Sequence, residues 1–230
     1  MADTKAKAHF SQQANILAVL ADALPAGRRA SVLDKVLAEP MLSSADGARS
    51  PAAGAAVGKG LGLAKASYYF RFYLARALEA TGRGDEYLPQ LEPWREMLDL
   101  GLSTWAETPD LASRSDCHAW SAHPNYDLLT IVAGIKPGAP GFKTVRIEPH
   151  LGTLDRLNAA LPHPKGEVAV AYRRSGAEVG ASVTLPAALT GGRGRARPAQ
   201  RNRARDHPRP RIIGRLRLPC GRSGVHFAHE

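Results

Sequence analysis

The chain has 230 residues, enough for one large domain or parts of two, and a formal net charge of +10. Residues 191–230 hold 11 Arg against two acids, whereas the first 190 residues hold the other 20 Lys and Arg against 19 acids. The body of the protein is therefore near neutral. A nucleic-acid-binding domain, which would carry its basic residues on the folded part, is disfavoured.

Cysteine content and hydropathy argue against two further classes, disulfide-stabilised proteins and membrane-spanning proteins. Cys117 and Cys220 lie in unrelated contexts and predict no disulfide framework. No run of about 18 apolar residues occurs, so the sequence predicts no membrane span. The polar start MADTKAKAHFSQQ lacks the apolar core of a signal peptide. These patterns predict a cytoplasmic protein that does not contact a membrane, and they leave its oligomeric state open.

Two short helices are predicted near the N-terminus. Ser11 is placed to cap a helix whose apolar side chains recur at helical spacing as far as Leu24, before a Pro-Ala-Gly turn. Residues 32–37 carry the apolar face of a second helix, which would pack on the first as a hairpin. Residues 43–66 contain five Gly and almost no large apolar side chains, so we expect a disordered insertion there.

Three more helices are predicted in the middle of the chain. Residues 67–82 begin with five aromatics in seven positions, and a helix that is aromatic on several faces is expected to be enclosed. Residues 84–99 predict a helix whose start is broken by Pro89 and Pro93. Residues 124–135 predict an apolar helix with Pro in its first turn. The aromatics expected in the core are Tyr68, Phe70, Phe72 and Tyr73.

The pattern changes to strands after residue 137. Apolar residues alternate with polar ones around residues 145–147, 168–172 and 179–185, which predicts three strands, too few to close a sandwich. Helices followed by strands indicate a helical domain with an appended β domain. Residues 191–230 show no usable pattern and predict a disordered Arg-rich tail. A shifted reading frame is an alternative explanation of that composition.

Candidate functional residues gather in residues 100–123, which contain two Trp, one Cys and two His among small polar side chains. Such a mixture in a connecting segment is typical of a site rather than of a core. A metal site built from Cys117, His118 and His123 matches no zinc spacing, and we predict no metal and no cofactor. A cysteine nucleophile is also disfavoured, because the adjacent Cys117 and His118 would point apart.

Carboxylate chemistry on a sugar is the third interpretation of this segment. Glu107 lies between Trp105 and Pro109, and an indole beside a carboxylate suits a glycosidase: the ring packs on a sugar face while the acid activates water. A fourth interpretation is that the acids of the segment only cap the following helices and solvate the loop. Composition alone leaves these last two alternatives open.

Three motifs in order carry a resemblance to a known family. They are the TWAETPD loop, RSDCHAWSAHP and PGFKTVRIEPHLGTL, and they are similar to the end of the catalytic domain and the start of the C-terminal β domain of bacterial alpha-L-rhamnosidases, in the six-hairpin glycosidase superfamily. FSQQANILAVLADAL and ASYYFRFYLARALEATG also resemble that family's preceding barrel helices. The resemblance covers roughly residues 9–42 and 64–188.

The resemblance implies a mainly α fold: a partial (α/α)6 six-hairpin barrel followed by an incomplete C-terminal β-sandwich. The barrel part would span residues 1–137, the start of the sandwich residues 138–190 and the tail residues 191–230. The implied activity is hydrolysis of terminal alpha-L-rhamnosyl residues with inversion, on a rhamnose-containing carbohydrate. No other partner is implied.

The resemblance also implies roles for single residues. Glu107 corresponds to the catalytic base of the TWAE loop. His118 and Trp120 are candidates for contacts with rhamnose, and Trp105 is a further candidate. Asp116 either orients His118 or a neighbouring arginine, or caps a turn.

One departure limits the implied activity. The family's general acid lies upstream in the barrel, and nothing before residue 9 can supply it. We therefore expect a fragment that is inactive alone. A protein of another class remains the alternative: a non-catalytic helical binding module whose basic tail contacts nucleic acid or an acidic surface.

Overall fold

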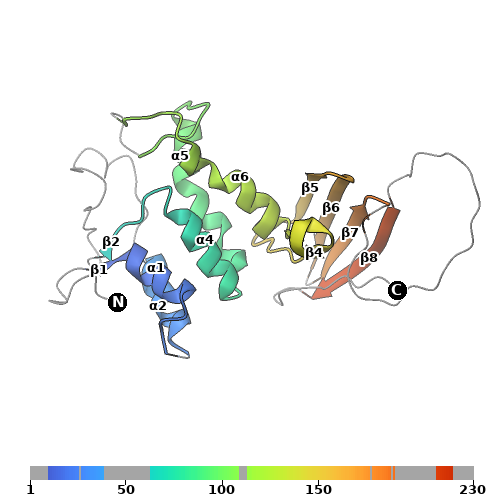
Figure 1. Ribbon diagram of the computed structural model, residues 1–230, viewed down its shortest axis with the longest axis horizontal. Coiled ribbons are helices and arrows are strands. Elements are labelled where there is room, and N and C mark those ends of the chain that lie inside the picture. The colour runs from blue at the N-terminus through green and yellow to red at the C-terminus, as the bar shows by residue number, and fades with distance from the viewer. Residues whose placement is uncertain are drawn as a thin grey trace, which may run out of the picture. The chain divides into compact units, whose positions relative to one another are not determined.

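A computed structural model gives the fold of the chain and describes residues 10–25, 27–38, 63–108, 113–176, 178–187, 189 and 211–219 (Figure 1). The chain divides into two compact units, Met1–Asp127 and Leu128–Glu230, rather than at residue 137. Each unit is described by itself below.

The first unit opens with a helix pair tied together by a buried glutamine. Ser11 caps the first helix by accepting a hydrogen bond from the Ala14 N–H at 3.1 Å, which confirms the predicted cap. Gln12 donates to the Val36 carbonyl at 2.9 Å and accepts from the Ala66 N–H at 2.7 Å. One side chain thus joins three segments of the chain. The elements here are β1 (Phe10–Ser11), α1 (Gln12–Leu20), α2 (Arg28–Ala38) and β2 (Leu63–Ala64), with β1 and β2 paired in parallel.

Short helical segments make up the rest of this unit. The helix predicted over residues 84–99 is instead two 3₁₀ turns and one eight-residue helix, because Pro89 and Pro93 each occupy the start of a helical segment. The helix predicted over residues 124–135 likewise divides into a short α-helix and a π turn. The elements are α4 (Arg71–Ala80), η1 (Gly84–Glu86), η2 (Leu88–Leu91), α5 (Glu92–Asp99), η3 (Ala119–Ala122) and α6 (His123–Asp127).

The second unit is built on strands. The π turn η4 (Leu128–Val132) leads into β3 (Ile135–Pro137), which pairs antiparallel with β4 (Val145–Ile147), and the 3₁₀ turn η5 (Pro140–Phe142) lies between them. An antiparallel four-stranded sheet follows in the order β5-β6-β7-β8. Its strands are β5 (Arg156–His163), β6 (Gly166–Ser175), β7 (Glu178–Leu185) and β8 (Arg211–Pro219).

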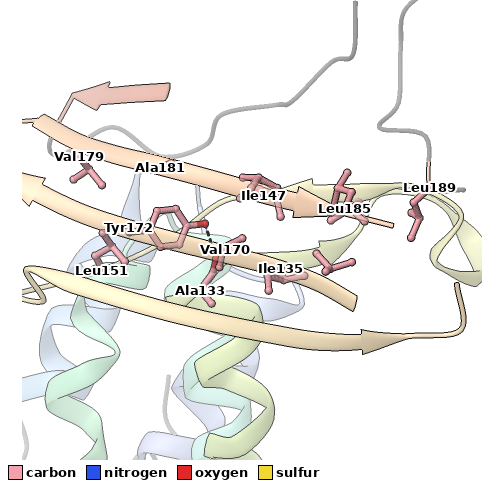
Figure 2. Close-up of a cluster of buried hydrophobic side chains, with 13 residues drawn as sticks. Ala133, Ile135, Ile147, Leu151, Val170, Tyr172, Val179, Ala181, Leu185 and Leu189 are labelled. Atoms are coloured by element: carbon pink, nitrogen blue, oxygen red, sulfur yellow. Dashed lines mark hydrogen bonds between the residues drawn. The ribbon is translucent and has the colours of Figure 1, made fainter. Parts of the chain in front are cut away.

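A single apolar core holds the second unit together (Figure 2). One face of the sheet contributes the buried alternate residues of β6 and β7, among them Val170 and Val183, and β3 and β4 pack against them through Ile135 and Ile147. The Tyr172 hydroxyl crosses this core and donates to the Ala133 carbonyl at 2.9 Å (Figure 2). The alternation of buried and exposed positions confirms the predicted period-two strands.

The fold class expected from the sequence, a mainly α partial (α/α)6 barrel followed by an incomplete β-sandwich, is wrong. The described residues contain five α-helices of five to 11 residues and three sheets, with about as many residues in strands as in α-helices. Helices this short and so often broken by proline or π turns do not form the ring of paired helices that a barrel requires.

The structure describes only part of the two segments for which the sequence predicts disorder. The insertion expected over residues 43–66 lies largely outside the described residues, although Leu63–Ala64 form β2. Within the Arg-rich segment 191–230, Arg211–Pro219 form β8, which pairs with β7; the remainder of that segment lies outside the described residues. Within the described residues, no helix is long and apolar enough to cross a bilayer.

Candidate functional site

The segment 100–123 folds as a hairpin-like loop in the first unit. The Glu107 N–H donates to the Ser115 carbonyl at 2.9 Å, and the His118 N–H donates to the Trp105 carbonyl at 2.7 Å. These two bonds place residues 104–107 and 115–118 side by side in opposite directions, and the Thr104 hydroxyl adds a bond to the Asp116 carbonyl. Residues 109–112, between these two arms in the sequence, lie outside the described residues. The loop therefore brings Glu107 and His118 onto one short ladder.

A buried anchor fixes the first arm of the ladder. Ala106 is buried, and its N–H donates to the Met97 sulfur at 3.3 Å. Trp105 is half-buried and packs on the cluster formed by Ala106, Met97, Tyr68 and Trp94. The sequence proposes Trp105 as a sugar contact, and the structure gives its ring a packing role as well.

Glu107 is held by an arginine fork. Its carboxylate accepts from Arg114 Nε at 3.0 Å and from Arg114 Nη2 at 2.5 Å, a bidentate geometry. The Glu107 side chain is 22% exposed, whereas that of Arg114 is 82% exposed. Arg114 pairs with Glu107, and Asp116, for which the sequence predicts either an orienting role or a turn cap, is exposed. The sequence does not reveal this pairing, because seven residues separate the two charges.

His118 and Trp120 lie together at the end of the second arm. Their rings are 5.8 Å apart in an edge-to-face arrangement, and Trp120 is 64% exposed. Trp120 also contacts the ring of Tyr69, which precedes α4, at 4.8 Å. Sequence reasoning assigned the aromatics around residue 70 to the core and did not single out Tyr69. The crowding of five aromatics into seven positions was the available signal, since one short helix cannot bury them all.

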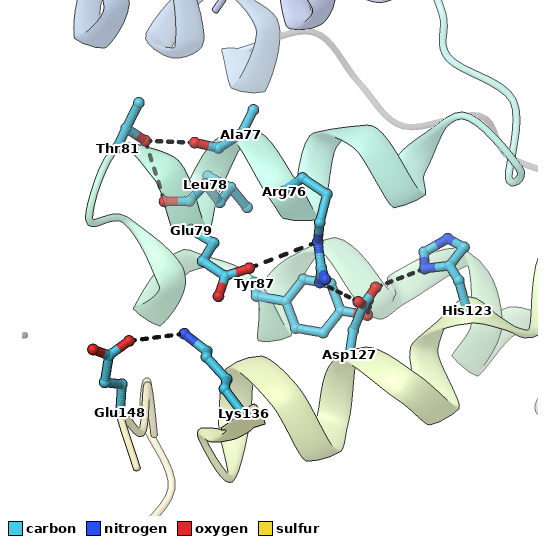
Figure 3. Close-up of polar contacts among 10 residues, drawn as sticks. All are labelled: Arg76, Ala77, Leu78, Glu79, Thr81, Tyr87, His123, Asp127, Lys136 and Glu148. Carbon is cyan, nitrogen blue, oxygen red and sulfur yellow. Dashed lines mark hydrogen bonds and ion pairs between the residues drawn. The ribbon is translucent and has the colours of Figure 1, made fainter. Parts of the chain in front are cut away.

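A buried polar network underlies this loop (Figure 3). Asp127 on α6 is fully buried and pairs with Arg76 of α4. It also lies 2.8 Å from His123 Nδ1 and accepts from the Tyr87 hydroxyl at 3.2 Å. Burial, then the negative charge of Asp127, raises the pKa of Tyr87, so this hydroxyl stays a donor. No sequence pattern predicts this network.

The metal and cysteine hypotheses gain nothing from the structure. The ring of His123 is occupied by Asp127 and by the Tyr68 carbonyl, 3.1 Å from Nε2. Cys117 is an exposed free thiol. Among the described residues, no group of three or more His, Cys, Asp or Glu could hold a metal ion.

One buried cation lies at the start of α4. Arg71, at the start of α4, is 3% exposed, and its Nε and Nη2 have no hydrogen-bond partner among the described residues. Burial lowers the pKa of Arg71 to about 10.

The fold of the chain is similar to part of three solved structures. The chain is similar to a GH78 family rhamnosidase of Bacillus sp. GL1, at 24% identity and a TM-score of 0.57 over 74% of the chain and 17% of that protein. It is also similar to the Streptomyces avermitilis alpha-L-rhamnosidase solved with L-rhamnose, at 20% identity and a TM-score of 0.56 over 79% of the chain and 19% of that protein. A third match is the alpha-L-rhamnosidase of Dictyoglumus thermophilum, at 20% identity and a TM-score of 0.56 over 76% of the chain and 19% of that protein.

One family model matches part of the sequence. Residues 134–191 match the family model of the bacterial alpha-L-rhamnosidase C-terminal domain. The predicted resemblance to bacterial alpha-L-rhamnosidases is therefore confirmed, and its sequence match falls in the second unit. No curated protein sequence matches. The chain spans 17–19% of the length of the solved structures described above.

Proposed function

We propose that the loop 100–123 is the base-side half of a site for hydrolysing terminal alpha-L-rhamnosyl bonds with inversion. The observation that carries this proposal is the short ladder that joins Glu107 to His118, beside the exposed ring of Trp120. The matches to rhamnosidases support the choice of sugar. The ligand is a rhamnose-containing carbohydrate.

In the proposed mechanism Glu107 deprotonates the attacking water. An inverting glycosidase needs one carboxylate as base and a carboxylic acid across the sugar that protonates the leaving oxygen. Arg114 fixes the plane of the Glu107 carboxylate, while the unused lone pairs of the two oxygens stay able to accept a proton. His118 is a donor for sugar hydroxyls, and Trp120 offers an apolar face to the ring.

Trp105 and Asp116 have supporting roles in this proposal. The backbone carbonyl of Trp105 accepts the hydrogen bond that fixes His118. The Trp105 ring packs against the cluster that contains Ala106, on the same arm as Glu107. Asp116 is exposed on the other arm of the ladder, where its carboxylate can accept from a sugar hydroxyl.

The chain alone is proposed to bind rhamnose without hydrolysing its glycosides. Among the described residues, the side chain that Glu107 contacts is the Arg114 cation, not a second carboxylate. The resemblance implies that the general acid belongs to an upstream part of the family's catalytic domain. Without that acid the leaving oxygen is not protonated.

The test combines a hydrolysis assay with a binding assay on the purified 230-residue chain. We expect no hydrolysis of an aryl alpha-L-rhamnoside above the buffer rate. We expect saturation-transfer NMR to show binding of L-rhamnose that Trp120→Ala abolishes and that Tyr126→Ala, a change at an exposed tyrosine on α6, preserves. Hydrolysis that disappears in Glu107→Gln would show that the chain contains both carboxyl groups. Absence of rhamnose binding would refute the proposed ligand.

A further inference from the structure

A row of aromatic side chains continues from the proposed rhamnose contacts onto the start of α4. We call His118, Trp120, Tyr69 and Tyr73 the aromatic surface. Successive ring centroids lie 5.8 Å, 4.8 Å and 6.0 Å apart along it. Each step has the size of a direct ring contact, so the four rings form one continuous surface.

The rings of the aromatic surface are held in place: Trp120 and Tyr69 are exposed, whereas His118 and Tyr73 are half-buried. Tyr73 is packed by Phe70 at 4.8 Å and by Phe72 at 5.5 Å. The Tyr69 and Tyr73 hydroxyls lie 3.4 Å apart, within hydrogen-bonding distance. Trp120 belongs to η3, which is anchored because the Trp94 indole donates to the Ser121 carbonyl at 2.7 Å. Exposed rings that are fixed in this way are pre-organised to bind a ligand.

The chemistry of this surface favours a neutral ring that bears hydroxyl groups. Trp120 and Tyr69 are 64% and 39% exposed, and both offer apolar faces to solvent. The hydrogen bond with Tyr73 raises the pKa of Tyr69, so the phenol is uncharged at neutral pH. The paired phenol hydroxyls at the far end add donors and acceptors beside the apolar faces. A pyranose ring, with C–H faces and equatorial hydroxyls, matches both features, whereas a charged ligand has no counter-charge among these four residues' rings.

We propose that Tyr69 and Tyr73 form a second sugar subsite, which binds the pyranose to which the terminal rhamnose is linked. This inference rests on the proposed function, because it takes Trp120 as the rhamnose contact. The Tyr69 ring lies directly against the ring of Trp120, and in this proposal the Tyr69–Tyr73 hydroxyl pair binds hydroxyls of the second sugar ring. The proposed substrate class is a rhamnosyl disaccharide or a longer glycan.

The test compares methyl alpha-L-rhamnoside with a disaccharide that carries a terminal alpha-L-rhamnosyl unit on glucose. Both are titrated into the 230-residue chain, and binding is measured by saturation-transfer NMR. We expect the disaccharide to bind about 2- to 12-fold more tightly, the gain that one aromatic contact provides. Tyr69→Ala should remove this gain, and the affinity for each of the two sugars is measured separately because the Tyr69 ring also contacts that of Trp120. Tyr73→Phe, which removes only a hydroxyl, should reduce the gain in part.

Tyr126→Ala is the matched control, since it truncates an exposed tyrosine outside the aromatic surface. Equal affinity for the two sugars, with rhamnose still bound, would overturn the second subsite and leave the proposed function standing. Absence of binding by either sugar would overturn both. An aryl alpha-L-rhamnoside forms the third arm: a gain seen for the aryl group but not for glucose would also overturn the sugar subsite, in favour of an aromatic aglycone.

Discussion

Asp127 is the side chain whose replacement should most weaken the first unit. It is fully buried and joins Arg76 on α4, Tyr87 after η1 and His123 on its own helix (Figure 3). Asp127→Asn keeps the shape of the side chain and removes its charge. The amide has one oxygen where the carboxylate has two, so the Arg76 guanidinium and the Tyr87 hydroxyl compete for a single acceptor.

The expected loss of stability is about 3 kcal/mol. Removing one partner of a buried ion pair costs roughly 3–5 kcal/mol, because the remaining charge is left desolvated. The lower end of this range applies here, since the Arg76 side chain is 20% exposed and keeps Glu79 at 3.7 Å. The matched control is Glu92→Gln, which breaks a pair with Arg95 whose side chains are 56% and 54% exposed. Exposed pairs of this kind contribute about 0–1 kcal/mol.

Urea unfolding followed by tryptophan fluorescence measures this difference in the right part of the molecule. All three tryptophans of the chain, Trp94, Trp105 and Trp120, belong to the first unit, and the Trp94 ring lies 5.0 Å from that of His123. The midpoint for Asp127→Asn should fall well below that of Glu92→Gln at an unchanged m-value. Equal midpoints for the two variants would refute the idea that this network stabilises the unit.

Three further predictions concern backbone geometry, pH and the arginine fork. Gly134→Ala should unfold the second unit, because Gly134 has a φ of +73° and an added Cβ would collide with the Glu148 backbone. Gly176→Ala, at a φ of +60° in open space, should lower the free energy of unfolding by only about 1 kcal/mol. Urea unfolding followed by circular dichroism compares the stability of the two variants. Burial raises the pKa of Tyr172, so the unfolded chain loses this proton first, and stability should fall above about pH 10 by up to about 1.4 kcal/mol per pH unit; Tyr172→Phe, assayed by the same unfolding, should remove that slope. Arg114→Gln should change the free energy of unfolding by less than about 1 kcal/mol, because its side chain is 82% exposed, and a larger change would show that the fork is structural.

Local sequence signals predicted the parts of the fold that depend on neighbours in the chain. Ser11 caps α1 as expected, and the alternating residues of β6 and β7 form the predicted strands. β5 was missed because its apolar positions, Leu157, Ala159 and Leu161, are only half-buried and its sequence contains a proline. β8 lies in Arg-rich sequence without a pattern, and its pairing with β7 across a long separation is not a local property.

The fold class failed because periodicity shows that a helix exists without showing what it packs against. Helical spacing predicts a helix over residues 84–99, with its start broken by Pro89 and Pro93, and another over residues 124–135, and the family resemblance then extends them to a barrel. Proline at the start of η2 and α5, and the π turn at Leu128–Val132, shorten both segments. Such interruptions reduce the apolar stripe that each helix can bury, and a ring of helices depends on that stripe.

The candidate site combines a residue whose role the sequence predicts with contacts that only the structure supplies. The pairing of residues 104–107 with residues 115–118 holds this residue and its contacts together in one loop. On the first arm, neighbouring residues alternate in environment: Ala106 is buried against Met97, and Glu107 reaches the Arg114 fork at the surface. The buried anchor needs a small residue, and the next position needs a carboxylate. Ala106 and Glu107, which are adjacent in the TWAE motif, are therefore required for different physical reasons. The position of Glu107 therefore depends on packing at Ala106 as much as on its own ion pair, and motif matching alone does not reveal that dependence.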